Sequence, residues 1–476
     1  MKRVAIIGGG ISGLSAAYAL EEKRRTGVEV EYVLYEASPR FGGVLVTEHV
    51  DGCLIEAGPD SFLTEKPWAS DLCRKLGFGD QLIGSNDADR KTYIVVRGKL
   101  IEMPDGLMFM VPTKLAPTLL SPLFSAQTKL RMAQEWFHPP HQAKGDETVA
   151  AFVERHYGPE MVDRLADPLL SGVYGGEASQ LSVRAVLPRF AEMEAKYGSL
   201  GRALLAARAA MASSAKGQPR PLFTSLKDGM QQMVDALVGV LDATLLNPGV
   251  VVQAVSPEAG GWVVSAGLQS DQFDALIVAL PTHGAARLLQ RSGPELASEL
   301  AGIDYSSSVT VALGFDKQVR ASLPPGFGFL VPRSEGKRML AATFVHNKFP
   351  HRAPDDRAIV RCFLGGARGE QMLALPEDEI LRIVREELDQ ILHLKVEPLF
   401  ARVFKWKGAM AQYGVGHLER LQRIEALRQK LPGLALAGNG YSGIGVPDCV
   451  RSGSSAVETT LHALGLVATA TPLTSS

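Results

Sequence analysis

The sequence predicts an α/β fold in which a parallel sheet with covering helices is interrupted by an inserted mixed-sheet domain and a helical domain. A strand–helix–strand pattern opens the chain around a cluster of glycines. A helix-then-strand pattern returns in residues 228–290, and a strand from Leu434, followed beyond a turn by a helix from Val450 to Leu464, comes near the end of the chain. Residues 146–211 read as helical, residues 303–365 as strand-rich, and residues 377–392 as an amphipathic helix. A chain of 476 residues is too long for one hydrophobic core, so two or three domains are expected.

The opening pattern has the order of a dinucleotide-binding unit. Val4 to Ile7 is an apolar run bounded by glycine, which is typical of a parallel strand buried on both faces. Leu14 to Lys23 predicts a helix and Val28 to Tyr35 a second strand, which Glu36 ends. The stretch Gly8 to Gly13 fits G-x-G-x-x-G. These elements in this order predict a Rossmann-like βαβ unit.

Each glycine of the motif has a separate physical role. Gly8 allows the tight turn, Gly10 lets the backbone approach a pyrophosphate, and Gly13 lets helix and strand pack closely. The helix N-terminus would then present free N–H groups and a positive dipole end to the pyrophosphate. Glu36 lies 23 residues after Gly13, where its carboxylate would accept hydrogen bonds from ribose hydroxyls and disfavour a 2′-phosphate.

The residues after Glu36 favour FAD over NAD. Two further glycine turns follow, Arg40-Phe41-Gly42-Gly43 and Gly58-Pro59-Asp60-Ser61-Phe62. A simple NAD dehydrogenase would enter another crossover helix at this point, whereas two glycine turns indicate a backbone that passes close to a longer, bent cofactor. No tethering residue is evident, so we expect FAD to be held without a covalent bond.

Six segments carry a resemblance to a known family. They are residues 8–13, 36–43, 58–63, 171–176, 406–417 (WKGAMAQYGVGH) and 441–451 (YSGIGVPDCVR). They resemble the flavin-containing amine oxidase superfamily and, within it, the protoporphyrinogen and coproporphyrinogen oxidases of bacterial haem synthesis. The resemblance covers nearly the whole chain.

The resemblance implies a set of cofactor contacts. It places FAD against Gly8, Gly9, Gly10, Ile11, Ser12, Gly13, Glu36, Ala37, Arg40, Gly43, Val44, Gly58, Pro59, Asp60, Ser61, Val252, Trp406, Ile444, Gly445 and Val446. One departure is Gly438-Asn439, where many flavin oxidases have an acid after the glycine. Because an amide can still bond a ribityl or phosphate oxygen, we expect FAD binding to be kept.

The implied reaction turns a porphyrinogen into a porphyrin in three two-electron steps, with hydride passing to flavin N5 and molecular oxygen as the final acceptor. Pyrrole protons can leave to water, so no catalytic side chain is assigned. The histidines are scattered along the sequence, and we expect structural roles for them. No metal site is expected. The substrate is a flat apolar ring edged with carboxylates, so its site should combine apolar walls with a few bases.

Three residues are candidates for substrate binding. Phe327 and Leu330 resemble the family segment that clamps the ring, although the same residues also fit a core strand. Lys66 follows the Gly58–Ser61 turn by five residues, so its ammonium could reach a propionate; the alternative is a solvated surface lysine.

The predicted domains are discontinuous. We expect an FAD-binding domain from residues 1–85, 220–290 and 425–476, a helical domain from 105–215, and a substrate-binding domain from 86–104 and 291–424. The segments 106–134 and 195–227 lack acids and combine apolar residues with bases, which suits peripheral contact with an anionic membrane. The alternative is that they wall the substrate cavity.

Composition narrows the setting. The net charge of −1 argues against a nucleic-acid partner, and the four cysteines form neither a C-x-x-C pair nor a disulfide framework. A cytoplasmic protein, peripheral to the membrane at most, is the simplest expectation, because no apolar run reaches about 18 residues and the N-terminus reads as a strand. A homodimer is compatible with the sequence.

Other functions stay open at this point. An amine oxidase or a carotenoid desaturase would share the cofactor motifs, and flavin-free carriers of prenylated proteins share the fold. Glu36 and the intact glycine motif argue against a flavin-free carrier. The sequence does not decide between a ring with two propionates and one with four.

Overall fold

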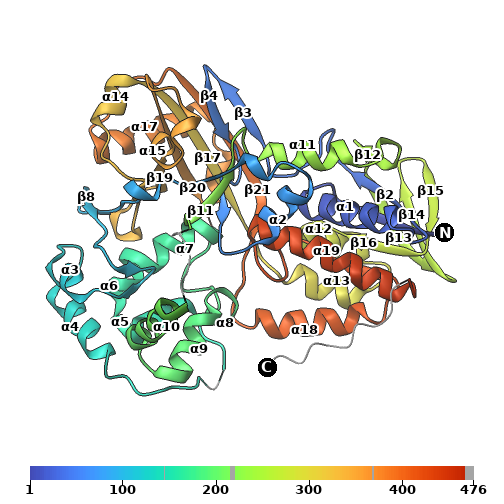
Figure 1. Cartoon of the computed structure of the whole chain (residues 1–476), viewed down its shortest axis with the longest axis horizontal. Helices are drawn as coiled ribbons and strands as arrows, with labels where there is room; N and C mark the ends of the chain where they lie inside the picture. The colour runs from blue at the N-terminus through green and yellow to red at the C-terminus, as the bar shows by residue number, and fades with distance from the viewer. Residues whose placement is uncertain (144, 215–219, 367–368, 467–476) are drawn as a thin grey trace.

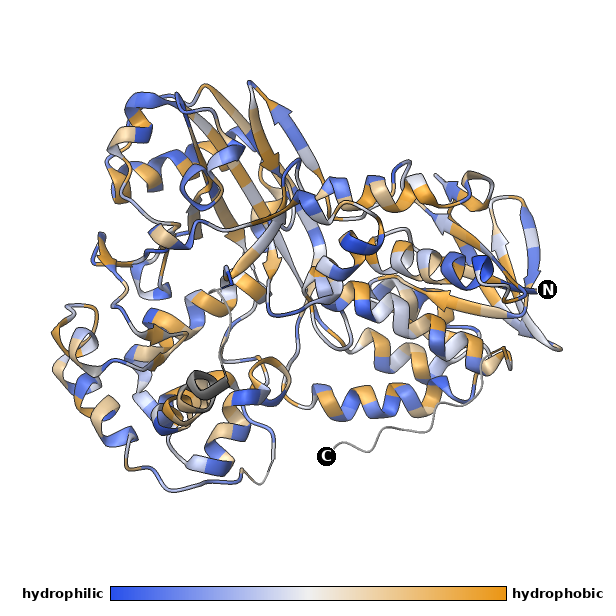
Figure 2. Ribbon diagram, viewed as in Figure 1, coloured by the Kyte–Doolittle hydropathy of each residue, from blue (hydrophilic) through white to orange (hydrophobic). Residues whose placement is uncertain are grey.

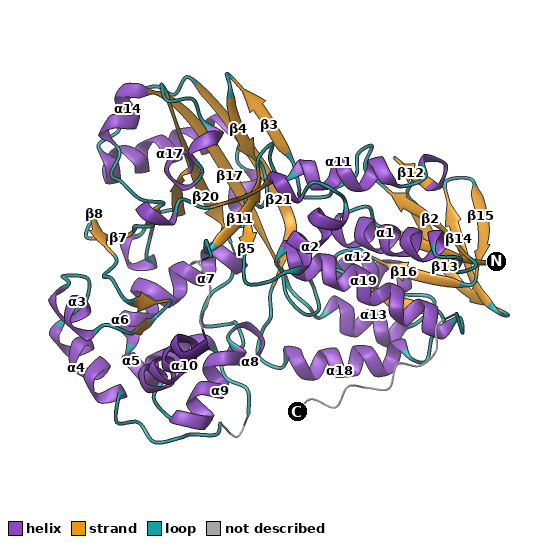
Figure 3. Ribbon diagram, viewed as in Figure 1, coloured by secondary structure: helices purple, strands orange, loops and turns teal. Residues whose placement is uncertain are grey.

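The computed structural model describes residues 1–143, 145–214, 220–366 and 369–466. Three regions lie side by side in Figure 1: a parallel sheet with its helices on the right, a mixed sheet at the upper left, and a group of helices at the lower left. Figure 3 shows that the lower left region is almost entirely helical. Each region has its own cluster of buried apolar side chains.

The parallel sheet has five strands in the order β12-β2-β1-β16-β22. Their bounds are Lys2–Ile7 for β1, Val30–Glu36 for β2, Leu246–Pro248 for β12, Ala275–Val278 for β16 and Leu434–Leu436 for β22. The central strands are apolar because both faces are covered, and Figure 2 colours β16 as largely hydrophobic. Segments from the start, middle and end of the chain thus build one sheet.

Helices cover both faces of this sheet. On one face lie α1 (Ile11–Arg25), α11 (Gln231–Val240) and α19 (Val446–Ala463). On the other face lie α12 (Thr282–Leu289), α13 (Pro294–Ala301) and the small antiparallel sheet of β13 (Val252–Glu258), β14 (Gly261–Ala266) and β15 (Gln269–Phe273). The close contact between α1 and α19 requires Gly453, because a Cβ there would lie 2.2 Å from the carbonyl oxygen of Ser12.

The mixed sheet has seven strands in the order β21-β17-β20-β19-β18-β7-β8. Their bounds are Thr92–Val96 for β7, Lys99–Glu102 for β8, Tyr305–Asp316 for β17, Gly328–Leu330 for β18, Met339–Phe344 for β19, Arg357–Gly365 for β20 and Phe400–Ala411 for β21. Only the pairing of β18 with β7 is parallel. The amphipathic helix α17 (Glu377–Leu392) packs its apolar side on one face, with Ile380, Val384 and Leu388 buried.

The helical region consists of short helices around a compact core. They are α3 (Leu115–Leu120), α4 (Ala126–Glu135), α5 (Val149–Tyr157), α6 (Pro159–Met161), α7 (Asp167–Tyr174), α8 (Val183–Val186), α9 (Pro188–Tyr197) and α10 (Leu200–Ser214). Prolines keep residues 105–135 from forming one long helix, as expected. The core includes Phe152, Tyr157, Met161 and Leu165.

Smaller elements join the three regions. They are β3 (Thr47–Val50), β4 (Cys53–Glu56), β5 (Phe62–Leu63), α2 (Trp68–Lys75), β6 (Leu82–Gly84), β9 (Leu107–Met108), β10 (Val111–Pro112), β11 (Phe223–Leu226), α14 (Lys317–Ser322), α15 (Val345–Lys348), α16 (Gln371–Ala374) and α18 (His417–Arg428). Helix α13, within residues 291–424, and helix α18, which crosses the predicted boundary at residue 425, pack with the parallel sheet rather than the mixed sheet. Among the described residues, no helix is long and apolar enough to cross a bilayer.

One helix boundary differs from the sequence prediction. The last helix begins at Val446, four residues before the Val450 start that the apolar pattern indicated. Gly445 lies at the N-cap and Pro447 within the first turn, where the fixed φ of proline suits a helix start. Residues 444–446 therefore lie at the N-terminal end of α19.

Candidate active site

The glycine motif forms a tight turn between β1 and α1. Gly8 has φ +106°, and a Cβ at Gly13 would lie 1.8 Å from the carbonyl oxygen of Gly8, so both positions require glycine. At Gly10, by contrast, a Cβ would meet no described atom within 4 Å. The first backbone bond inside the helix is donated by Leu14 to Gly10. The turn therefore leaves open space beside Gly10 and free N–H groups in the first turn of α1.

Glu36 lies at the carboxyl end of β2, directly beside this turn. Its carboxylate accepts the N–H of Gly9 at 2.6 Å and that of Ser38 at 2.7 Å. The N–H of Val250 donates to the carbonyl of Glu36 at 2.8 Å, so the strand that begins at Val252 lies close by. The structure thus brings Glu36, Ala37 and the Val252 segment together at the glycine motif.

The two further glycine turns also meet here. The N–H of Gly42 donates to the carbonyl of Gly9 at 2.8 Å, and a Cβ at Gly58 would lie 2.0 Å from the carbonyl oxygen of Val44. The Arg40 guanidinium donates to carbonyl oxygens of its own turn, those of Phe41 at 3.0 Å and of Gly43. Three glycine-bearing segments, all from residues 8–61, therefore form one continuous backbone surface.

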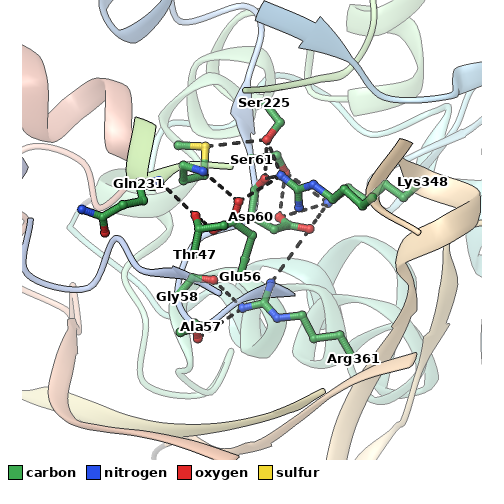
Figure 4. Close-up of polar contacts among 12 residues, drawn as sticks. Thr47, Glu56, Ala57, Gly58, Asp60, Ser61, Ser225, Gln231, Lys348 and Arg361 are labelled. Carbon is green, nitrogen blue, oxygen red and sulfur yellow. Dashed lines mark hydrogen bonds and ion pairs between the residues drawn. The ribbon is translucent and has the colours of Figure 1, made fainter. Parts of the chain in front are cut away.

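The Ala57–Ser61 turn is tied to the mixed sheet. The indole Nε1–H of Trp406, on β21, donates to the carbonyl of Ala57 at 2.9 Å. Arg361, on β20, donates to the carbonyl of Gly58. Figure 4 shows Arg361 and Lys348 approaching this turn from the mixed-sheet side.

A cluster of buried charges, which we call the Asp60 cluster, consists of Glu56, Asp60, Lys348, Arg352 and Arg361. The Lys348 ammonium lies 2.9 Å from an Asp60 carboxylate oxygen, and Arg352 Nη2 lies 3.2 Å from a Glu56 oxygen. Arg361 Nη1 is 3.9 Å from Asp60. All five side chains are at most 15% exposed. No sequence motif identifies the three bases. Arg361 alone gives a signal, because it is a charged residue within the otherwise apolar run of β20.

Burial and the neighbouring charges shift the pKa values of the residues in the Asp60 cluster. Burial opposes the charged form of Asp60, but Lys348, Arg361 and Arg352 outweigh it and hold the pKa of that carboxyl well below its usual range. Burial lowers the pKa of Lys348, with Asp60 acting in the opposite direction, and burial raises the pKa of Glu56. The Asp60 carboxyl is therefore held in its charged form although it is buried.

Lys66 is held by the C-terminal motif. Its ammonium donates to Asp448 Oδ2 at 2.7 Å; the lysine side chain is 35% exposed and that of Asp448 only 3%. A Cβ at Gly443 would lie 2.3 Å from Asp448 Cγ, so the carboxylate packs against the turn that leads to Ile444, and the N–H of Gly443 donates to the Tyr413 hydroxyl at 2.8 Å. Lys66 therefore lies beside the 444–446 segment.

Leu330 is the last residue of strand β18 in the mixed sheet, and Phe327 immediately precedes that strand. Leu330 is half-buried on β18 and packs against the helical core, whereas its neighbour Phe329 belongs to the core of the mixed sheet. Phe327 is buried, and its N–H donates to the carbonyl of Lys91 at 2.7 Å. Leu330 thus lies between the mixed sheet and the helical region.

The polar groups at the end of β22 are already engaged within the chain. Asn439 donates to the carbonyl of Ala409 at 2.8 Å and accepts from the Tyr305 hydroxyl at 3.1 Å.

His417 stacks on Tyr413 with ring centroids 4.1 Å apart, and buried His346 contacts the backbone of Ile359. Burial lowers the pKa of His346 to about 4, so it stays neutral in a structural role.

Comparison with known proteins decides the family. The model of the flavin containing amine oxidoreductases matches residues 11–461. The chain belongs to this family. Within it, the chain is 34% identical over 467 residues to the coproporphyrinogen III oxidase of Bacillus subtilis (strain 168), covering 97% of this chain and 98% of that one. It is 27% identical over 488 residues to protoporphyrinogen oxidase 2, chloroplastic/mitochondrial, of Arabidopsis thaliana, covering 96% and 93%.

Solved structures of the family share the fold. A chain from Exiguobacterium sp. 255-15, provisionally named a protoporphyrinogen oxidase, superposes with a TM-score of 0.87 at 29% identity, covering 98% of this chain and 99% of that one. Putrescine oxidase superposes with a TM-score of 0.68 at 18% identity, covering 97% and 99%, which shows the fold alone. The chain therefore has the mixed α/β fold of flavin amine oxidases, and its cofactor is FAD.

The residues present fit this cofactor. Open space at Gly10, free N–H groups at the start of α1 and the Glu36 carboxylate are the features that a dinucleotide requires. Cys449, the cysteine nearest the C-terminal motif, is buried, and burial raises the pKa of its thiol to about 12. Such a thiol is a poor nucleophile, which favours FAD held without a covalent bond.

Proposed function

We propose that this protein is a porphyrinogen oxidase of haem synthesis, which uses FAD and molecular oxygen to oxidise coproporphyrinogen III or protoporphyrinogen IX to the porphyrin. The observation that carries the proposal is full-length similarity. Relatives named coproporphyrinogen III oxidase from Bacillus subtilis, Staphylococcus aureus and Propionibacterium freudenreichii each align with at least 96% of this chain. An amine oxidase is less favoured, because the putrescine oxidase likeness extends to the fold only.

The cofactor contacts follow from the backbone surface described above. We assign the pyrophosphate to the glycine motif, Gly8 to Gly13, and the ribose to Glu36, whose carboxylate is held at that site by two backbone N–H groups. Arg40, Gly43, Val44 and residues 58–61 would line the path of the cofactor. Ala37 and Val252 would lie at the adenine end, and Trp406 with residues 444–446 beside the isoalloxazine. FAD bound there would accept hydride from the substrate.

The substrate would lie between the mixed sheet and the helical region. Leu330, half-buried where these regions meet, supplies an apolar wall, and Phe327 extends it. Lys66 is assigned to a propionate: an ammonium has three donors, Asp448 accepts one, and the side chain keeps 35% of its exposure. The chain's own contribution is then to orient the ring and exclude water, while pyrrole protons leave to solvent.

The domain division proposed here keeps the sequence boundaries. The FAD-binding domain comprises residues 1–85, 220–290 and 425–476, the helical domain 105–215, and the substrate-binding domain 86–104 and 291–424. Support comes from the two sheets, whose strands fall into the first and last of these sets. Helix α13 packs with the FAD-binding domain although it lies within residues 291–424, and so does α18, which crosses the boundary at residue 425.

We further propose peripheral contact with an anionic membrane through the helical domain. Four apolar side chains of α3, α4 and the following turn are exposed: Leu119, Leu120, Leu130 and Phe137. Exposed Lys114, at the N-cap of α3, and half-buried Lys129, on α4, suit anionic head groups. The second acid-free segment, 195–227, includes residues 215–219, which lie outside the described residues. A homodimer that covers the same side chains is the competing explanation.

Two measurements test the function. The purified protein should be yellow, and denaturation should release FAD into the supernatant; flavin that stays with the precipitated chain would contradict non-covalent binding. Incubation with coproporphyrinogen III or protoporphyrinogen IX in air should then produce porphyrin fluorescence and hydrogen peroxide. Flavin without either product, in the presence of putrescine oxidation, would instead favour an amine oxidase.

A further inference from the structure

Three carbonyl groups of the Ala57–Ser61 turn, those of Ala57, Gly58 and Asp60, accept hydrogen bonds from side chains. Trp406 donates to the carbonyl of Ala57 at 2.9 Å. The carbonyl of Asp60 accepts from Arg352 Nη2 at 2.9 Å and from the Ser225 hydroxyl at 2.7 Å. In Figure 4, Arg361 reaches the carbonyls of Ala57 and Gly58, and Ser225 lies near Asp60. The turn is therefore fixed through its acceptors.

Fixing the carbonyls also fixes the N–H groups. In a trans peptide the C=O and the following N–H point in opposite directions, and the described chain has no cis peptide bond. The N–H of Gly58 thus points away from Trp406, and that of Ser61 points away from Arg352. Within the residues that the structure describes, neither N–H has a hydrogen-bond acceptor. Each of these two N–H groups therefore points away from the side chains that hold the preceding carbonyl, and is free to donate to a bound group.

The Asp60 cluster also carries an unbalanced charge. Its three bases, Lys348, Arg352 and Arg361, face two acids, Glu56 and Asp60, which leaves one excess positive charge. Because all five side chains are nearly buried, solvent screens this charge poorly. The excess charge acts on whatever lies against the Ala57–Ser61 turn.

We propose that the Asp60 cluster sets the reduction potential of the bound FAD, by holding the N–H groups of Gly58 and Ser61 toward the flavin and by placing an excess positive charge behind them. Both effects favour the reduced flavin, which carries more negative charge than the oxidised form. Lys348, Arg352 and Arg361 are positioning residues that need not touch the cofactor. The inference rests on the proposed placement of FAD but not on the identity of its substrate.

Opposite substitutions within one ion pair separate charge from structure. Lys348→Met removes a positive charge and Asp60→Asn removes a negative charge, although both break the same 2.9 Å contact. A unit charge roughly 10 Å from a redox centre, at an effective dielectric constant of about 20, changes its equilibrium constant about tenfold. We therefore expect the reduction equilibrium to become about tenfold less favourable in Lys348→Met and about tenfold more favourable in Asp60→Asn, shifts of about 30 mV downward and upward.

The measurement is the two-electron midpoint potential of the FAD-bound protein, read from its absorption spectrum against reference dyes. Lys348→Arg, which keeps the charge, should restore the potential. Arg382→Gln is the matched control, because it removes a positive charge from the exposed side of α17 and should shift the potential little. The proposal would be overturned if Lys348→Met and Asp60→Asn shift the potential in the same direction. It would also be overturned if neither shifts the potential further than Arg382→Gln does.

The result is separate from the fate of the proposed function. No porphyrinogen enters the measurement, so a protein that binds FAD but oxidises another substrate still gives a decisive potential. If Lys348→Met fails to retain FAD, Asp60→Asn and Lys348→Arg remain informative: an unshifted or lowered potential in Asp60→Asn refutes the charge argument by itself. A wild-type protein that binds no FAD would refute the proposed function and this inference together.

Discussion

Replacement of Lys66 by alanine tests whether this lysine binds the substrate. The structure places its ammonium in a half-exposed ion pair with Asp448, 2.7 Å away. A propionate contact at such a position should contribute about 1–2 kcal/mol, between a screened surface pair and a hydrogen bond between charged groups. Because 1.4 kcal/mol corresponds to about tenfold, Lys66→Ala should raise KM by roughly 5–30-fold. The flavin spectrum should stay intact, and kcat should change less, because the lysine holds the ring in ground and transition states alike.

Asp448 provides the control. Its carboxylate is 3% exposed and packs against the turn that leads to Ile444, so Lys66→Ala could also act by leaving this buried charge with only Arg451, 3.7 Å away, as a partner. Asp448→Asn removes that charge. If Lys66 binds a propionate, Asp448→Asn alone should leave KM unchanged or lower it, and the double variant should keep the KM of Lys66→Ala.

Steady-state assays on coproporphyrinogen III and protoporphyrinogen IX measure this comparison. A double variant whose KM returns to the wild-type value would refute the substrate assignment, because it would show that Lys66 acts only through Asp448. An unchanged KM of Lys66→Ala for both substrates would return the residue to a surface role. Loss of flavin from Lys66→Ala, restored by Asp448→Asn, would instead show that the pair supports the cofactor turn.

Three further predictions follow from the described contacts. Glu36→Ala should weaken FAD binding by about 1.5–3 kcal/mol, since the bonds of a charged acceptor to ribose are lost; titration of the apoprotein measures this, and equal affinity would mean that Glu36 does not reach the ribose. His156 contacts Glu194 at 3.0 Å and Glu135 at 3.4 Å, and although burial opposes its charged form, these carboxylates raise its pKa. The ion pairs of His156 therefore stabilise the fold fully below about pH 6.5, and this contribution is lost as the pH rises through the raised pKa. The Tm of the wild type should fall across that pH range, whereas the Tm of His156→Gln should change little. Equal changes of Tm with pH in the two proteins would contradict this prediction. Finally, the protein should sediment with anionic vesicles at low salt, and Phe137→Glu should abolish this; sedimentation that the substitution leaves unaffected, or no sedimentation of the wild type, would remove the membrane proposal.

Much of the parallel-sheet region could be predicted because its signals are local. The glycine motif, the apolar strand before it and the acid after the second strand lie within the first 36 residues, and each has a direct backbone reason. The helix α17 has the bounds that its amphipathic pattern predicts, Glu377–Leu392. The start of α19 was predicted four residues late, because the glycine and proline before Val450 were read as a turn although proline also opens helices.

The partner of Lys66 could not be predicted in the same way. The distance along the chain from Gly58 limited where Lys66 could reach, but the side chain that it meets lies 382 residues further on. From the sequence, the two expected environments of the Lys66 ammonium are a propionate of the substrate and bulk water. A buried aspartate in the C-terminal motif is a third, and only the packing of that motif against the Gly58–Ser61 region brings it within reach.

The Asp60 cluster shows the same limit more sharply. Arg361 interrupts an apolar strand, and because an unpaired charge in a strand interior is costly, its position alone predicts a buried partner. The sequence cannot say which partner, since Asp60 lies 301 residues earlier on a turn that glycine and proline had already marked for the cofactor. That coincidence has a physical consequence. Because charged residues hold this turn, the proposed placement of FAD against it predicts that a change in their charge balance acts on the cofactor as well as on the fold.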